Sequence, residues 1–458
     1  MLKKQKFSLF KIVISNSLVA IFATGLFAVN TQDKYLSTNK DSKLLLKPID
    51  GLSDEQYDKF ILGRSFFAIP WVEAPSATTA RDGLGPLFNA NTCISCHPSN
   101  GRGTLFNDNL TSRSLVARIS IESNNSKEHK NIQKKNGFIP HNIYGSQLSI
   151  NGIHGVPFEG KVKIEFQEQK VSFPDGEIDT LLKPKYSLEN LNYGALDNAN
   201  ISYRIAPSLN GMALIELISK EDILKNVDLE DKNNDGISAK ANFVYSNISK
   251  KMELGIYTWK ASVPTLKEQV SNAAINDMGI TTSIHKNDNC TTFQEECNNA
   301  DKARDKIDLP DDRLDAITYY LKNLKSYSSK RDKKFEEGLE IFEQISCAKC
   351  HISSFDTTKG FKVYPYSDFL LHDMGEELAD GRVEFNANKS EFRTAPLWGL
   401  SLHEKINKKD VRLLHDGRAR TFQEAILWHG GEAKASKENY MNLPKEKREK
   451  LIEFLKGL

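Results

Sequence analysis

The feature that most constrains this chain is a pentapeptide, Cys-x-x-Cys-His, that occurs twice. One copy spans Cys93–His97 and the other spans Cys347–His351. This is the attachment signature of c-type haem, in which two thioethers hold the porphyrin and the adjacent His binds the iron from one side. The two copies therefore predict two covalently bound haems c. Their expected residues are Cys93, Cys96 and His97 for the first haem, and Cys347, Cys350 and His351 for the second.

Zinc and a redox-active dithiol are the alternatives for these cysteines. The Cys-x-x-Cys knuckles of a zinc ribbon commonly lie about 15 to 20 residues apart. Here the two copies lie in opposite halves of the chain, and each has a His directly after it. A thioredoxin-like pair needs a βαβ context and does not need the His. Haem is the interpretation that uses all the residues of both motifs.

The first 28 residues have the pattern of an export signal. Lysines cluster before a mostly apolar stretch that runs from Ile12 to Val29, and polar sequence follows from Asn30. This pattern predicts a signal peptide over residues 1–28, cleaved after Ala28. The alternative is an uncleaved N-terminal anchor, because the stretch approaches the length that spans a bilayer. Both predict a periplasmic protein, soluble or N-terminally anchored, with membrane contact only if the leader is uncleaved.

The net charge and the two remaining cysteines limit the possible partners and the possible redox chemistry of the chain. The chain has 62 Lys and Arg against 60 Asp and Glu, a net charge of +2, which predicts no nucleic acid partner. Two cysteines lie outside the haem motifs, Cys290 and Cys297. In an oxidising compartment they favour a local disulfide. A redox-active dithiol is the alternative, but no nearby feature indicates a lowered thiol pKa.

Amphipathic segments recur in the same order around both motifs. Each motif follows a segment with apolar residues at helical spacing, and each half of the chain ends in another such segment. The sequence therefore predicts a mainly α protein of two tandem cytochrome c-like haem domains, residues 50–327 and 331–458. The expected helices are 56–67 and 311–324 in the first domain, and 331–345 and 446–458 in the second.

The first predicted domain is much longer than the second, which indicates an insertion. Residues alternate between apolar and polar over Gly160–Phe166 and Val171–Phe173, and Pro174–Gly176 has the composition of a turn. The insertion is therefore expected to contain a small β-hairpin.

Several longer segments resemble the bacterial di-haem oxidoreductase family, sometimes labelled thiol oxidoreductases. The resemblance covers roughly residues 52–458 and places the chain near the di-haem cytochrome c peroxidases and the methylamine-utilisation di-haem enzyme. It implies an oxidoreductase of peroxidase type. The segments that carry it are Leu84–Asn89, Tyr144–Leu148, Asn234–Ser238, Pro365–Gly381, Arg393–Gly399, Leu414–Ala419 and Ala425–Ala433.

The resemblance also suggests the sixth ligand of the second haem. In di-haem peroxidases a Met lies fourteen residues after the His of a His-Asp-Gly segment and binds the electron-transfer haem. Here His415 begins that segment, and the same spacing leads to His429. Met374 is the competing ligand, because its thioether suits haem iron. A haem without either ligand is the third possibility. Ligation by two histidines would lower the reduction potential relative to His and Met.

The first haem is the expected reactive site. No His occurs between His97 and His129, so the position opposite His97 is expected to be open or to hold water. Peroxide cleavage needs an acid/base that moves a proton between the two oxygens. Related peroxidases use a Gln and a Glu at a separation similar to that of Gln147 and Glu159, which makes these two the candidate catalytic residues. The alternative for Glu159 is a solvated carboxylate at the start of the hairpin.

Three further features have both a functional and a structural interpretation. Arg102 closely follows the first motif and is a candidate for pairing a haem propionate. Trp259 and Trp398 are candidates for electron passage between the haems, or ordinary core residues. Asp231, Asn233, Asp235 and Ile237 occupy the ligand positions of a calcium loop, whereas an Asx-rich turn is the alternative.

The predicted activity is reduction of hydrogen peroxide, or another small oxidant, with electrons from a small periplasmic donor such as a cytochrome or a cupredoxin. A pure electron-transfer cytochrome with both irons six-coordinate is one alternative. Oxidation of a thiol, a sulfur compound or a protein side chain is another.

Overall fold

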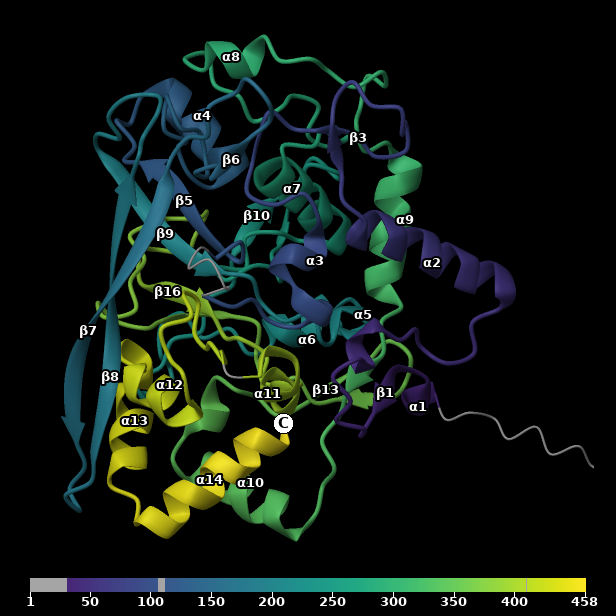
Figure 1. Ribbon diagram of the computed structural model, residues 1–458. Helices are drawn as coiled ribbons and strands as arrows, with labels where there is room; N and C mark the ends of the chain where they lie inside the picture. The colour runs from purple at the N-terminus through teal and green to yellow at the C-terminus, as the bar shows by residue number, and fades with distance from the viewer. Residues whose placement is uncertain (1–30, 106–111, 409) are drawn as a thin grey trace, which may run out of the picture.

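The computed structural model describes residues 31–105, 112–408 and 410–458 (Figure 1). The predicted signal peptide, residues 1–28, lies outside this range. Within the described residues, no helix is both long and apolar enough to cross a membrane.

Helices and short strands alternate along the whole chain. The longer helices are α2 (Asp54–Ala68), α4 (Lys127–Asn136), α7 (Leu266–Met278), α9 (Asp311–Lys322), α10 (Lys333–Gln344), α13 (Lys434–Met441) and α14 (Lys445–Gly457). The shorter ones are α1 (Thr31–Tyr35), α3 (Cys93–Cys96), α5 (Met212–Ile215), α6 (Lys220–Leu224), α8 (Glu295–Asn298), α11 (His403–Asn407) and α12 (Phe422–Trp428).

The strands form two-stranded ladders throughout the described residues. They are β1 (Leu36–Ser37), β2 (Val72–Glu73), β3 (Asp82–Leu84), β4 (Leu87–Phe88), β5 (Leu115–Ile121), β6 (Asn151–Gly152), β7 (Lys161–Ser172), β8 (Ile178–Glu189), β9 (Ala199–Ile205), β10 (Phe243–Tyr245), β11 (Met252–Leu254), β12 (Ser326–Tyr327), β13 (Phe355–Asp356), β14 (Lys362–Val363), β15 (Leu371–Asp373) and β16 (Glu391–Arg393).

The prediction of a mainly α fold is wrong, because the structure is 31% helical with 20% strand. The strand content comes largely from two antiparallel ladders, β5 with β9 and β7 with β8. In β5 and β9 the Val, Ile and Tyr residues favour extended backbone, and alternate side chains are buried. The periodicity around the haem motifs is helical, but much of the chain between them is not.

The four helices expected near the motifs are present, and they pack as two similar pairs. α2 begins with a capping box between Ser53 and Gln56 and packs against α9, whereas α10 packs against α14. Both crossings are close. A Cβ atom at Gly63 of α2 would lie 2.0 Å from the carbonyl oxygen of Ala316, and one at Gly338 of α10 would lie 2.3 Å from the Cβ atom of Phe454. The repeated crossing agrees with the predicted internal repeat, while the domain limits 50–327 and 331–458 stay a prediction.

The predicted hairpin is present and longer than expected. β7 and β8 pair over their full length, from Lys161 opposite Glu189 to Ser172 opposite Ile178. The hairpin runs along one side of the molecule, from the region of α4 and β5 down to α13 and α14 (Figure 1). Near its tip Phe173 and Leu181 are buried in the same hydrophobic cluster as Phe454 of α14. The insertion in the first half of the chain therefore packs onto the second half.

Arg448 of α14 anchors the hairpin tip, and its loss should destabilise the protein. This buried side chain donates hydrogen bonds to Asp175 at 2.7 Å and to Glu177 at 2.8 Å. We expect Arg448→Ala to lower the free energy of unfolding by about 2 kcal/mol, because hydrogen bonds to charged groups and stem packing are both lost. Denaturant titration measures this change in the free energy of unfolding. Lys445→Ala is the matched control, since Lys445 is exposed and lies 3.8 Å from Glu177.

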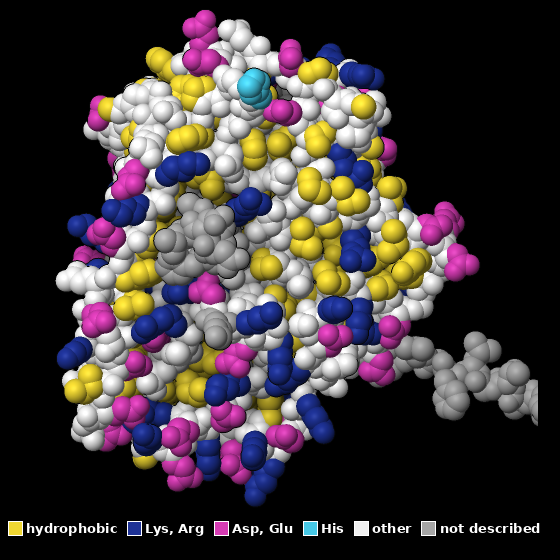
Figure 2. Space-filling model, viewed as in Figure 1, with side chains coloured by type: hydrophobic (Ala, Val, Ile, Leu, Met, Phe, Trp, Pro, Cys, Tyr) yellow, Lys and Arg dark blue, Asp and Glu magenta, His cyan; other side chains and the backbone are white. Residues whose placement is uncertain are grey.

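The surface carries charges of both signs. Lys and Arg side chains are interspersed with Asp and Glu over the lower part of the face in Figure 2, where α10 and α14 lie. Hydrophobic side chains gather on the same face over α2, which exposes Tyr57, Ile61 and Leu62. The face therefore has mixed charge rather than a single-sign patch, as the net charge of +2 leads one to expect.

Candidate functional site

One large internal cavity connects the two motifs. Its volume is about 930 Å³, which is at the upper end for ligand sites in proteins. Cys93, Cys96 and His97 line it at one end, and Cys347, Cys350 and His351 line it at the other. The wall also includes most of the other residues predicted from sequence: Arg102, Gln147, Glu159, Trp259, Met374, Trp398, His415 and His429. The fold therefore brings residues from both halves of the chain around one space.

Each motif histidine is oriented by a backbone carbonyl group. The Nδ1–H of His97 donates to Pro207 O at 2.9 Å, and that of His351 donates to Tyr366 O at 2.8 Å. Because a carbonyl can only accept, each ring carries its proton on Nδ1 and its lone pair on Nε2. This is the usual arrangement of a histidine that binds a metal through Nε2. Both histidines thus fit the role of proximal iron ligand.

The four motif cysteines are free and partly or fully buried. Burial raises the pKa of Cys93 and of Cys347 to about 12. A redox-active dithiol needs the opposite shift, since its thiolate is the reactive form. The pKa values therefore argue against a thioredoxin-like role, and the location of the thiols along a large cavity fits attachment of a bulky group.

His429 lines the same cavity as His351. Its Nδ1–H donates to Ala425 O at 2.6 Å, at the end of α12, which leaves the lone pair on Nε2. Burial, together with a smaller contribution from the imidazole of His429, lowers the pKa of His351 to about 4, so His429 lies within electrostatic range of His351. Met374 is half-buried and lines the same cavity. Both candidates for the sixth ligand are thus present around the second motif.

His372 and His415 have other roles in the same region. His372 lies between two carboxylates, with Asp368 at 2.7 Å and Glu432 at 2.9 Å. Although burial opposes it, these hydrogen bonds raise the pKa of His372 well above its usual range. His415 stacks on Phe392 with ring centroids 4.3 Å apart. His372 is therefore held by hydrogen bonds and His415 by ring stacking, which agrees with a polar or packing role for each.

The predicted catalytic pair lies at the other end of the cavity. Glu159 is 2% exposed; its Oε2 accepts from the backbone N–H of Ser149 and its Oε1 accepts from Gln294 Nε2 at 2.6 Å. Burial raises the pKa of Glu159 to about 7. Gln147 turns to other partners: its Nε2 donates to Asp277 Oδ1 at 2.8 Å. Its Oε1 is buried and has no hydrogen-bond partner among the residues that the structure describes.

The raised pKa of Glu159 makes stability depend on pH. The unfolded carboxyl ionises near 4.5 and the folded one near 7, so the free energy of unfolding should fall by about 3 kcal/mol as the pH rises through this window. We expect Glu159→Gln to remove this part of the pH dependence. Denaturant titrations at pH 5 and pH 8 measure it, and an unchanged difference between the two pH values would contradict the assignment.

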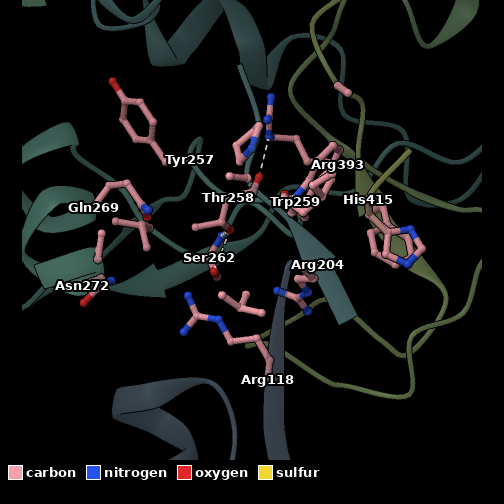
Figure 3. Close-up of a pocket in the computed structure, with 18 of the residues that line it drawn as sticks. Arg118, Arg204, Tyr257, Thr258, Trp259, Ser262, Gln269, Asn272, Arg393 and His415 are labelled. Carbon is pink, nitrogen blue, oxygen red and sulfur yellow. Dashed lines mark hydrogen bonds between the residues drawn. The ribbon is translucent and has the colours of Figure 1, made fainter. Parts of the chain in front are cut away.

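Asp277 is a candidate that sequence analysis missed. It lies at the end of α7, and its charge affects the pKa values of Cys93, Cys96 and His97, so it lies close to the first motif. Gln269 and Asn272 of the same helix face the cavity opposite Arg118 and Ser262 (Figure 3). The only sequence signal for Asp277 was that it follows Gln269 by eight positions in one helical segment.

Several buried cations line the cavity. Arg204 is paired with Asp380 at 2.8 Å and Glu384 at 2.7 Å; Lys260, which is buried outside the cavity lining, lies 3.2 Å from the same Asp380. In contrast, Arg102, Arg118 and Arg393 form no ion pair with any carboxylate of the described residues. Arg393 donates to the carbonyl oxygen of Thr258 (Figure 3). Since burying an unpaired charge is costly, these guanidinium groups fit a cavity that receives carboxylates, and haem carries two propionates.

The two tryptophans have different environments. Trp259 donates from Nε1 to Ile205 O at 2.9 Å and lies under the guanidinium of Arg102, 5.0 Å from its ring. Trp398 packs against Gly211, where a Cβ atom would lie 2.1 Å from its ring. Trp259 belongs to a hydrophobic cluster with Phe392, against which Met374 packs, and all three line the cavity.

Two further sequence motifs remain, the Cys290–Cys297 pair and the calcium-like loop, whose Ile237 lines the cavity. Cys290 and Cys297 form the predicted disulfide. In the calcium-like loop, oxygens of Asp231, Asn233 and Asp235 accept backbone N–H groups, and Asp235 pairs with Lys349 at 3.0 Å. Among the described residues, no group of three or more His, Cys, Asp and Glu is arranged to hold a metal ion. Calcium binding therefore stays a prediction.

Comparison with known proteins gives one family. The sequence model described as "Di-haem oxidoreductase, putative peroxidase" matches residues 36–458. No curated protein and no solved structure matches the chain. The matched range includes both motifs and every cavity residue discussed above, and the free imidazole nitrogens and unpaired arginines fit the haems that the family name states. The chain is a member of the di-haem oxidoreductase family.

Proposed function

We propose that this protein is a periplasmic c-type cytochrome that reduces hydrogen peroxide to water with electrons from a small redox protein. The observation that carries the proposal is the asymmetry of the cavity. Both motifs have a carboxylate nearby, Asp277 for the first and Asp368 for the second, but the histidine of the second motif is also shifted by the imidazoles of His372 and His429. A second imidazole suits electron transfer, and a carboxylate suits proton transfer to a small substrate.

Attachment of the haems would use the motif residues directly. Cys93 and Cys96 would form thioethers to the first haem, and Cys347 and Cys350 to the second. His97 and His351 would bind iron through Nε2, the nitrogen that carries the lone pair. The bound haems supply one-electron chemistry, and the remaining steps depend on side chains of this chain.

The acid/base step needs a carboxylate near the first motif. Reduction of one peroxide takes two electrons and two protons; the O–O bond breaks and two waters form. A carboxylate of the chain would take the proton from one peroxide oxygen and return it to the other, which leaves as water. Asp277 is the nearer group, held by Gln147 Nε2 at 2.8 Å. Glu159, predicted from sequence, has the pKa that suits proton exchange near neutral pH.

Electrons would enter from a donor such as a cytochrome or a cupredoxin and pass from the second end of the cavity to the first. His429 would be the sixth ligand of the second haem, with Met374 as the competing ligand. The cluster of Trp259 and Phe392, with Met374 packed against it, lines the cavity and offers a packed route for electron passage.

Spectra of the fully oxidised and half-reduced protein test the proposal. We expect one low-spin haem in both states and a second haem that reacts with added peroxide in the half-reduced state. Two low-spin haems that are inert to peroxide in both states would instead support a pure electron carrier. The intact mass of the protein gives the number of covalently bound haems. A single haem would contradict the assignment of one of the motifs.

A further inference from the structure

Arg102 and His403 are buried side chains from opposite halves of the chain, and each has a nitrogen without a partner. Arg102 is 6% exposed and His403 is 4% exposed. The Nε of Arg102 and the Nδ1 of His403 have no hydrogen-bond partner in the described structure. Both residues line the cavity. A buried polar group left unpaired costs about 1–3 kcal/mol, and a charged one costs more. The Nε–H of Arg102 lacks an acceptor, and the neutral ring of His403 can carry its proton on Nδ1 and donate as well.

Local packing brings the two residues together. Arg102 follows the first motif closely, and α11, which begins at His403, packs on the turn at Pro98–Asn100 directly after that motif. Asn407 of α11 donates from its side-chain amide to Arg102 O at 2.9 Å. Besides burial, the guanidinium of Arg102 lowers the pKa of His403, to about 3. The side chains of Arg102 and His403 therefore lie within electrostatic range of each other in one part of the cavity wall.

The guanidinium of Arg102 has neutral neighbours. It donates to the carbonyl oxygen of Leu414 and lies 5.0 Å from the ring of Trp259. Among the described carboxylates none lies within ion-pair distance of it. Asp416 is the acidic residue that affects its pKa, but that carboxylate is paired with Arg418 at 2.8 Å. Arg204, in the same cavity, has two carboxylates at hydrogen-bond distance. Arg102 thus lacks the counter-ion that its neighbour has.

We propose that Arg102 and His403 together bind the carboxylate of one haem propionate. This rests on the proposed di-haem c function. A carboxylate has two acceptor oxygens, which match one N–H of the guanidinium and one N–H of the imidazole. A haem attached at Cys93 and Cys96 would thereby be held by residues of both halves, so that α11 of the second half positions the first haem. A propionate of the second haem has the same chemistry, and the experiment separates the two.

The pair Arg102 and His403, called the clamp below, should affect the reduction potential of the haem whose propionate it binds. Reduction makes a haem more negative, so a nearby cation favours the reduced form and raises the midpoint potential. Loss of the Arg102 cation, or of the His403 N–H that would offset part of the propionate charge, should therefore lower the midpoint potential of the haem that they hold and leave that of the other haem unchanged. Because the two residues would share one carboxylate, the effects of the two substitutions should not add.

The experiment uses the two-haem protein as secreted, with variants Arg102→Leu, Arg102→Lys, His403→Leu and the double variant. Spectroelectrochemical titration measures both midpoint potentials, and resonance Raman follows the propionate bending modes. We expect the same haem to shift down in Arg102→Leu and His403→Leu, and Arg102→Lys to keep part of the potential since it keeps the charge. The Arg102→Lys variant also keeps the proposal testable if Arg102→Leu does not fold. His141→Gln is the control, because His141 is buried and its ring is hydrogen-bonded at both nitrogens.

The outcomes are distinct from those of the proposed function. Midpoint potentials and propionate modes that match those of His141→Gln would overturn the clamp, whatever the protein does with peroxide. A shift of the first haem or of the second supports it and identifies the haem concerned. A protein that is inert to peroxide but shows the shift keeps the clamp while losing the peroxidase assignment. A secreted protein without covalent haem would overturn both.

Discussion

Asp277→Asn should lower the turnover of hydrogen peroxide by a factor of about 10²–10⁴, the usual contribution of a positioned acid/base. The substitution keeps the shape of the side chain and an oxygen that can accept from Gln147 Nε2, so the wall of the cavity should stay in place. What it removes is the ability to take a proton and return it. Steady-state rates with a chemically reduced artificial donor measure the effect, after intact mass has established that both haems are attached.

Glu159→Gln is the matched variant, because it makes the same chemical change at the carboxylate predicted from sequence. Glu159 is held by Ser149 and Gln294, whereas Asp277 shifts the pKa values of Cys93, Cys96 and His97. We therefore expect the smaller loss at Glu159. The reverse order would return the catalytic role to Glu159, and full activity in both variants would contradict an acid/base step at this end of the cavity.

His429→Met should raise the midpoint potential of the second haem, by on the order of 0.1 V within the roughly 0.8 V range that axial ligands control. Replacement of an imidazole by a thioether favours the reduced iron, as in the cytochromes that use His and Met. His429→Ala should instead leave a high-spin second haem, because the Nε2 lone pair of His429 is lost. Spectroelectrochemical titration and electron paramagnetic resonance measure these changes.

Met374→Leu is the control for this position. Leu is similar in volume and lacks a donor atom, so we expect a low-spin second haem with an unchanged potential. If Met374→Leu produces the high-spin haem and His429→Ala does not, then Met374 is the ligand. In that case the fourteen-residue spacing from His415 leads to a histidine with a structural role.

Local sequence patterns predicted the elements that depend on neighbouring residues. The helices beside the motifs begin and end within a few residues of their predicted positions, because caps such as Ser53 and Asp332 and the apolar spacing act within a few turns. The hairpin was expected since the turn at Pro174–Gly176 follows an alternating strand. The mainly α fold class was wrong because β5 and β9 are far apart in sequence and become a ladder only by pairing.

The candidate site divides in the same way. The thioether cysteines and the proximal histidines are adjacent in the chain, so a motif of five residues was sufficient to predict them. Asp277, Arg118 and His403 had no such signal. Asp277 and His403 lie far from either motif in sequence, and Arg118 lies in a strand beyond the first motif; the side chains that surround each of them depend on how the fold assembles the cavity. The predicted partnership of Gln147 with Glu159 had only spacing in its favour, and the two side chains turn to different partners.

Sequence by itself therefore determined that this chain carries two haem motifs, each with a helix before it and a closing helix after it. Covalent chemistry and short-range periodicity are properties of neighbouring residues. Only the tertiary structure decided that the two motifs share one cavity and that their surroundings differ, with His429 at one end and Asp277 at the other. Burial, charge pairing and the free nitrogen of a histidine arise from contacts between distant segments, and no local pattern contains them.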